Sequence, residues 1–311
     1  MSTSLPPTID PVAARRWDQS LSETSPWLHE EVARRMQERL DWITLQPAAW
    51  AHWSPARGGL AAHKLVTRRY SNADCYVMEP SAKHLQATRE ALKKPWWNAA
   101  RWVKSATHFE APAPESVQML WANMALHMAA DPQQMINTWH QALDIDGFLM
   151  FSCLGPDSLR EIRALYQRLG WPAPSHEFTD MHDWGDMLVA AGFAEPVLDV
   201  ERIVLTFATP ERLLDELRTL GRNLHPARFA GLRGRAWYRR LKSELDAGRA
   251  PTSPEAAKAA KVTLNDASER GLIPLTFEVI YGHALKPKPR VAMRPHATLS
   301  LQEMRRQLKR T

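Results

Sequence analysis

The sequence has few of the features that mark secreted, membrane or metal-binding proteins. Only two of its 311 residues are cysteines, Cys75 and Cys153, which excludes a disulfide framework and gives no zinc-ligand spacing. No stretch approaches the roughly 18 consecutive apolar residues of a transmembrane helix. The opening "MSTSLPPTIDP" lacks the basic and apolar segments of a secretion signal. We therefore expect a cytoplasmic protein with no membrane segment and no bound metal.

No strong charge of either sign is present. The 40 Lys and Arg residues against 34 Asp and Glu give a net charge of +6, which suits acidic partners but is too mild to indicate nucleic acid binding. Tryptophan, in contrast, is abundant, with thirteen copies. Because large aromatic side chains are mostly buried, we expect these residues to serve packing, with stacking on a flat ligand as the less common alternative.

The first half of the chain alternates short apolar runs with amphipathic stretches. A helix is expected at 25–43, with Ser25 as its cap. The expected strands then cover 48–53, 75–80, 101–106, 117–122 and 147–154, the last started by the turn "DIDG". The helices between them cover 59–70, 81–94 and 131–143. This alternation predicts an α/β fold with a doubly wound, mostly parallel sheet.

The second half adds helices and two more strands. A helix follows at 155–170, and the β-branched segments 200–207 and 275–285 can pair as antiparallel neighbours at one sheet edge. Helices at 210–222, 228–247 and 254–261 lie between them as a cap. The expected organisation is a helical lead-in (1–45), a core (46–208), a helical insertion (209–270), a last strand (271–290) and a basic tail (291–311).

The stretch 46–60, "QPAAWAHWSPARGGL", stands where a nucleotide-binding α/β domain places its first strand and glycine-rich loop. Most of the glycines of such a loop are missing. The stretch therefore raises the question of whether the cofactor site of such a domain is kept.

Longer segments resemble a known family. The run 119–163, which contains "MLWANMALHMAADPQQMINTWHQAL" and "GFLMFSCLGPDSL", is similar to the strand 4 to strand 5 region of class I S-adenosylmethionine-dependent methyltransferases. The segments 30–43, 178–207 and 279–287 narrow the resemblance to the malonyl-acyl-carrier-protein O-methyltransferases of biotin synthesis. The resemblance runs from about Arg15 to Pro287. It implies a seven-stranded sheet whose last two strands are antiparallel, with S-adenosyl-L-methionine bound across the carboxyl ends of strands 1, 2 and 4.

The resemblance also implies site residues. His52 matches the acidic residue that ends strand 1 in the family, and Glu79 matches the acid that accepts hydrogen bonds from the cofactor ribose. Three positions match the glycines of the loop, and Asn123 falls near the methyl-transfer centre. The loop positions are Ser54, Ala56 and Gly58, of which only the last keeps its glycine.

These replacements have a physical cost. A Cβ on a loop that needs positive φ or close ligand approach strains the backbone or fills the site. Pro55 removes a donor, and His52 removes a fixed negative charge. The family also carries a tyrosine in the segment that closes over the site, where this chain has Ser22 or a neighbour. We therefore expect cofactor binding to be weaker than the family's, or lost.

Three further groups of residues have competing interpretations. The segment 180–186, "DMHDWGD", is best read as a helix start capped by an aspartate, with a substrate-side role for Asp180 and His182 implied by the resemblance; a metal site is the less favoured alternative. His127 is either a packed histidine or a base near the active centre. The basic run 228–242 is either a solvated helix face or a docking surface for acidic acyl carrier protein, and includes Arg235, Arg239 and Arg240.

Three functions remain open. The first is methyl transfer from S-adenosyl-L-methionine to the free carboxylate of malonyl-acyl carrier protein in biotin synthesis. The second is a catalytically inactive relative that keeps the fold as a binding or regulatory module. The third, also drawn from resemblance, is a relative that methylates a protein side chain.

Overall fold

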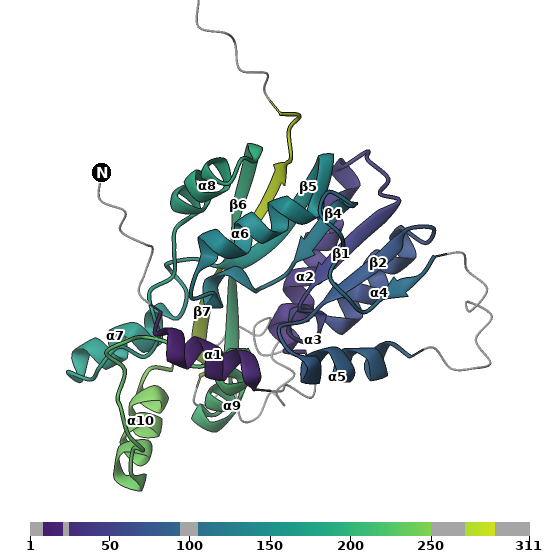
Figure 1. Ribbon diagram of the computed structural model, residues 1–311. Coiled ribbons are helices and arrows are strands. Elements are labelled where there is room, and N and C mark those ends of the chain that lie inside the picture. The colour runs from purple at the N-terminus through teal and green to yellow at the C-terminus, as the bar shows by residue number, and fades with distance from the viewer. Residues whose placement is uncertain (1–8, 21–24, 94–104, 250–270, 290–311) are drawn as a thin grey trace, which may run out of the picture.

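The computed structural model describes residues 9–20, 25–93, 105–249 and 271–289 (Figure 1). These residues form a seven-stranded sheet of order β3-β2-β1-β4-β5-β7-β6. The strands from β3 to β5 are parallel, and β7 is antiparallel to both β5 and β6. The strands are β1 (Ala49–Trp53), β2 (Asp74–Met78), β3 (Thr107–His108), β4 (Val117–Ala122), β5 (Leu143–Leu154), β6 (Ala194–Phe207) and β7 (Ile273–Leu285). The predicted fold class and the antiparallel edge are confirmed.

Two strand predictions need correction. The third strand was expected at 101–106, but β3 is the two-residue Thr107–His108, and residues 101–104 lie outside the described ranges. The turn "DIDG" was expected to precede the fifth strand, but β5 already begins at Leu143. The reason is long-range pairing: Asp146 N–H donates to the Lys286 carbonyl, and Lys286 N–H donates to that of Gly147, at 2.9 and 2.8 Å.

The sheet is covered on both faces. Consecutive residues of a strand point to opposite sides, so Trp50 and Trp121 belong to one core while Ala51 and Leu120 belong to the other. The first core contains α2 (Trp27–Arg39) and α4 (Leu60–Arg69), and the second contains α6 (Pro132–Ala142) and α8 (Met181–Ala190). Trp50, Trp121, Trp139 and Trp184 are fully buried, which confirms a packing role for these four tryptophans.

The expected cap of α2 is wrong. Pro26 holds the N-cap position and makes no side-chain cap bond. The Ser25 hydroxyl instead donates to the Ala56 carbonyl and accepts from Leu60 N–H, both at 3.1 Å. Ser25 therefore ties the start of α2 to the loop that follows β1.

The remaining helices gather toward the end of the sheet where β1 ends (Figure 1). They are α1 (Pro11–Gln19), α3 (Pro55–Gly58), α5 (Ala82–Leu92), α7 (Arg160–Arg168), α9 (Pro210–Leu220) and α10 (Arg235–Ala247). The last was expected to begin at 228, but 228–234 are not helical and contain Gly231 and Gly234, which are poor helix formers. The helix expected at 254–261 lies outside the described residues. Within the described ranges, none of the helices has the length and apolar character to cross a bilayer.

Candidate active site

The loop after β1 begins with a residue in an unusual conformation. Ser54 has φ 51° and ψ 53°, in the left-handed region where a side chain costs roughly 1–2 kcal/mol. The resemblance matched this position to a glycine of the family, and strain of this kind is the cost predicted for the replacement. Gly58 is retained for a different reason: a Cβ there would lie 3.0 Å from the Asn123 carbonyl oxygen.

The backbone of this loop is held by other parts of the protein. Ala56 N–H donates to Glu79 Oε1 at 2.8 Å, and the Gly58 carbonyl accepts from the Asn123 amide. The Arg57 carbonyl lies 2.9 Å from His29 Nδ1. At the start of α4, the N–H groups of residues 61 and 62 donate to the carboxylate of Glu30. The loop therefore keeps its shape through contacts with α2, β2 and β4 rather than through a ligand.

Glu79 directly follows β2, which ends at Met78. Only one of its two carboxylate oxygens is hydrogen-bonded within the protein. Oε1 accepts from Ala56 N–H and from the Thr88 hydroxyl at 2.6 Å. Oε2 is buried and has no hydrogen-bond partner. Burial raises the pKa of the Glu79 carboxyl, although both hydrogen bonds oppose that shift. A buried acceptor without a partner is costly, so Oε2 is suited to a ligand hydroxyl.

His52, the candidate at the acidic position, points away from any ligand. It is fully buried, and its Nδ1 lies 3.1 Å from His63 Nδ1 with the two rings stacked. Burial lowers the pKa of His52 well below its usual value, so the ring is neutral. One of the two Nδ1 atoms donates and the other accepts, so the two rings are hydrogen-bonded to each other. His52 therefore has a structural role.

Asn123 is likewise committed to the protein. Its amide nitrogen donates to the His29 carbonyl at 2.8 Å and to that of Gly58, and its amide oxygen accepts from the Ser152 hydroxyl at 2.6 Å. The side chain clamps α2 and the loop to the ends of β4 and β5.

A cavity of about 390 Å³ opens at the carboxyl ends of β1 and β4; we call it the first cavity. Three of the predicted residues line it, namely Ser54, Gly58 and Asn123, whereas His52, Ala56 and Glu79 do not. Pro80, next to Glu79, does. Its other walls are Trp17, Asp18, His29, Trp53, Arg57, residues 124–125, residues 128–131, Gln134, Met135, Thr138 and Leu220. Its volume falls within the roughly 300–1,000 Å³ range of small-molecule sites.

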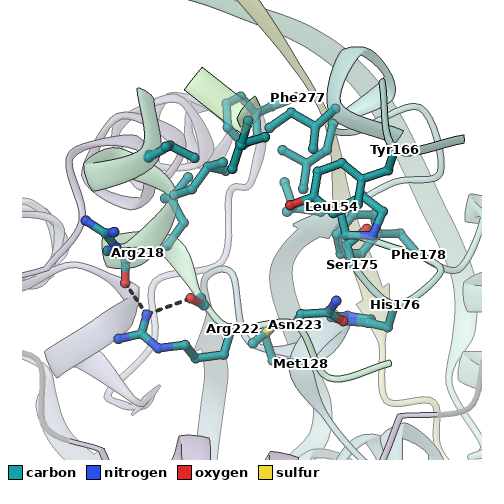
Figure 2. Close-up of a pocket in the computed structure, with 18 of the residues that line it drawn as sticks. Met128, Leu154, Tyr166, Ser175, His176, Phe178, Arg218, Arg222, Asn223 and Phe277 are labelled. Atoms are coloured by element: carbon teal, nitrogen blue, oxygen red, sulfur yellow. Dashed lines mark hydrogen bonds between the residues drawn. The ribbon is translucent and has the colours of Figure 1, made fainter. Parts of the chain in front are cut away.

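A second cavity of about 300 Å³ lies beside the first and shares Met128 and Leu220 with it. Its lining is mostly apolar and comes from α7, α9, α10 and β7 (Figure 2). The polar exceptions include His127, Ser175 and His176 in one part of the wall, with Arg218 and Arg222 across from Ser175 and His176. Sequence reasoning found only His127 among these, because the others come from separate segments with no motif.

Four buried polar atoms of the second cavity's lining residues have no partner: His127 Nδ1, Ser175 Oγ, His176 Nδ1 and Trp237 Nε1. His176 Nε2 lies 2.7 Å from the His127 carbonyl, which can only accept, so Nε2 carries the hydrogen. Burial lowers the pKa of His176, which keeps the ring neutral. Its Nδ1 is therefore a hydrogen-bond acceptor, matched to an N–H or O–H of a ligand.

The segment 180–186 lies outside both cavities. The Asp180 carboxylate caps α8 by accepting from the N–H groups of His182 and Asp183, as predicted for an N-cap. The His182 side chain is 78% exposed and pairs with Asp180 at 3.3 Å. Among the described residues, no three ligand-type side chains gather closely enough to hold a metal ion.

The basic run 228–242 divides into two kinds of residue. Arg228 pairs with Asp10 at 2.6 Å, Lys242 pairs with Glu211 at 2.9 Å, and the Arg233 guanidinium packs 4.2 Å from the Trp237 ring. The three arginines predicted to meet a partner are exposed on α10: Arg235, Arg239 and Arg240. Of these three, Arg240 also has its guanidinium 5.8 Å from the centre of the Trp171 ring. Arg228, Arg233 and Lys242 are thus engaged within the protein, whereas Arg235, Arg239 and Arg240 are exposed.

Comparison with known proteins agrees with this geometry. Residues 56–151 match the family model described as "Methyltransferase domain". The chain is 33% identical to the malonyl-[acyl-carrier protein] O-methyltransferase of Gallionella capsiferriformans, over 86% of this chain and 87% of that protein. It is also 33% identical to that of Laribacter hongkongensis, over 85% and 84%. The YcgJ protein of Bacillus subtilis shares the fold, with 13% identity, a TM-score of 0.50, and coverage of 83% of this chain and 99% of that one.

The sheet order and the cavity at the carboxyl ends of β1 and β4 define a class I methyltransferase. Within that class, the chain belongs to the malonyl-[acyl-carrier protein] O-methyltransferase family.

The cofactor of this family is S-adenosyl-L-methionine, and the first cavity lies where an α/β sheet places such a ligand. The first cavity lies where β1 and β4 end, and Pro80 in its wall follows Glu79. Glu79 does not line the cavity, but its unpaired Oε2 is an acceptor of the kind that a ribose hydroxyl requires. The charge of the site differs from what the resemblance implies, because neutral His52 stands at the position matched to an acid and Arg57 lines the cavity. Ser22, at the position of the family tyrosine, lies outside the described residues.

Proposed function

We propose that the protein is a cytoplasmic S-adenosyl-L-methionine-dependent O-methyltransferase that methylates the free carboxylate of a malonyl group on acyl carrier protein, in biotin synthesis. The observation that carries this proposal is the pair of adjoining cavities. The first suits the methyl donor, and the second, mostly apolar, suits an acyl thioester on its arm. Their common wall at Met128 and Leu220 would bring the two reacting groups together.

The bound cofactor would supply an electrophilic methyl group, and the protein would supply position and a dry site. A carboxylate is ionised at neutral pH, so the reaction needs orientation and desolvation rather than a strong base. His127 is therefore not required to remove a proton. It is 5% exposed, and its ring lies 5.9 Å from that of Phe178 in an edge contact, as expected of a packed histidine.

Arg222 is the group best placed to hold the acceptor carboxylate. It lines the second cavity, and its guanidinium lies 5.6 Å from the ring of Trp17, which lines the first. Nη1 donates to the carbonyls of Arg218 and Gly221, at 2.5 and 2.8 Å, which fixes the orientation of the guanidinium (Figure 2). A guanidinium held in this way can pair with a carboxylate through two parallel hydrogen bonds.

Helix α10 connects this site to the carrier protein. Trp237, Tyr238 and Leu241 line the second cavity, while Arg235, Arg239 and Arg240 of the same helix are exposed. An acidic carrier protein attracted to the arginines would therefore present its acyl arm next to the apolar cavity.

Mass spectrometry of malonyl-acyl carrier protein after incubation with the protein and S-adenosyl-L-methionine tests the proposal directly. We expect a gain of one methyl group on the malonyl chain, and growth of a biotin auxotroph that lacks its own methyltransferase. A correctly folded protein that leaves the malonyl chain unmodified would contradict it.

A second candidate is a non-catalytic member of the family that binds the acylated carrier protein. It is favoured by the loop after β1, whose backbone is held by protein groups, and by the missing acid at His52. In that case the protein would bind malonyl-acyl carrier protein and leave it unmodified.

A further inference from the structure

Arg57 connects the loop after β1 to α1. Its guanidinium carbon lies 4.0 Å from the centre of the Trp17 ring. Nη2 donates to the carbonyls of Trp17 and Ser20 and to the Ser20 hydroxyl, the last two at 2.6 and 3.2 Å. Asp18 is also near, with Oδ1 3.8 Å from Nη1. An aromatic face, two carbonyl oxygens and a carboxylate thus surround one cation.

The cage around Arg57 forms part of the first cavity. Trp17, Asp18 and Arg57 all line it, and the Arg57 side chain is only 13% exposed. S-adenosyl-L-methionine carries positive charge at its sulfonium and its amino group, and S-adenosylhomocysteine, which lacks the sulfonium, keeps the charged amino group. The groups that now surround the guanidinium are those that attract such a cation. Arg57 therefore occupies surroundings that would otherwise be open to the ligand.

The contact also carries a cost that a ligand could relieve. Nε of Arg57 is buried without a hydrogen-bond partner, and burial opposes the charge of the guanidinium. An unpaired buried donor destabilises the closed arrangement. Nη2 of Arg57 is thus well hydrogen-bonded, whereas Nε has no partner.

We propose that Arg57 sets the affinity of this protein for its cofactor: it is a tethered cation that occupies part of the first cavity and fastens α1 over it, so that S-adenosyl-L-methionine binds only by displacing it. The inference rests on the proposed function for the identity of the ligand alone. Arg57 lies in the loop after β1, but it would act through its contacts with α1.

Calorimetry with S-adenosylhomocysteine tests this without any acceptor, so a failure of methyl transfer leaves the result readable. We expect R57T to bind at least ten-fold more tightly than the unchanged protein. Hydrogen exchange of the amides in 11–20 should become faster in R57T, because α1 loses its fastening. R57K, which keeps the charge but not the fork, should fall between the two.

Two controls make the result specific. R89T removes a guanidinium that lies 5.0 Å from the Phe109 ring, outside both cavities, and should change neither measurement. If R57T does not fold, R57M keeps the apolar stem and decides the question by the same measurements. A folded R57T or R57M that binds S-adenosylhomocysteine no better than the unchanged protein would overturn the proposal.

Discussion

His52 and His63 lie in the protein interior with their Nδ1 atoms 3.1 Å apart. Each ring is adjacent to Trp50, at centroid distances of 5.6 and 5.5 Å. The two rings share a hydrogen bond in the core, and the burial of neutral His52 makes the fold sensitive to protons.

Acid should therefore destabilise the protein earlier than carboxylate protonation alone would. Burial lowers the pKa of His52 and His127 well below the usual 6.5 and that of His29 to about 4. The unfolded chain takes up protons below pH 6.5 and the folded chain does not, so stability is full above that pH and falls below it. Each such histidine costs about 1.4 kcal/mol per pH unit below 6.5. Urea unfolding at pH 7.5, 6 and 5 measures the slope.

Removal of the Asn123 amide should loosen the site. N123A leaves the Ser152 hydroxyl and the carbonyls of His29 and Gly58 without their partner in a buried place. We expect a loss of about 3 kcal/mol or more of unfolding free energy, since each of the three unpaired buried groups costs roughly 1–3 kcal/mol. S152A removes one of these three contacts and should cost about a third as much. Equal stability of N123A and the unchanged protein would show that the clamp contributes nothing.

The acceptor nitrogen of His176 should contribute to binding of the carrier-protein arm. The phosphopantetheine arm of a carrier protein offers amide N–H donors, and Nδ1 of His176 is an unpaired acceptor. H176Q can keep the bond to the His127 carbonyl and loses Nδ1, so we expect about ten-fold weaker binding of malonyl-acyl carrier protein. Binding of the carrier protein without its arm should be the same for both proteins. If the arm-free carrier protein loses affinity to the same extent, His176 acts on the fold rather than on the arm.

Charge reversal on α10 should slow association with the carrier protein. Replacement of Arg235, Arg239 and Arg240 by glutamate should lower the association rate by about ten-fold or more at low salt, with the difference shrinking as salt screens the charges. Stopped-flow fluorescence measures this rate. K64E, on the exposed face of α4 and outside both cavities, changes the charge without touching the surface and should have a much smaller effect.

The sequence allowed the sheet to be predicted where apolar runs were uninterrupted, as at Val117–Ala122, which matches β4. It failed where pairing partners far along the chain decide the strand, as for Leu143–Asp146 in β5, whose pairing the Lys286 region completes. Of the site residues predicted from the loop pattern, Ser54 and Gly58 do line the first cavity. The same pattern could not show that His52 turns to His63, because that depends on packing between β1 and α4. Ser175 and Arg222 carry no local signal, because tertiary folding alone brings them to one cavity.

The partition at Met128 and Leu220 has a consequence for how the chemistry is controlled. Both side chains are apolar, and in the proposed reaction their bulk would set the distance that a methyl group crosses between the two occupants. A larger side chain at either position would separate the methyl donor from the acceptor, while both ligands could still bind in their cavities. The rate of methyl transfer would then depend on the size of these two side chains, even though every polar contact stays in place.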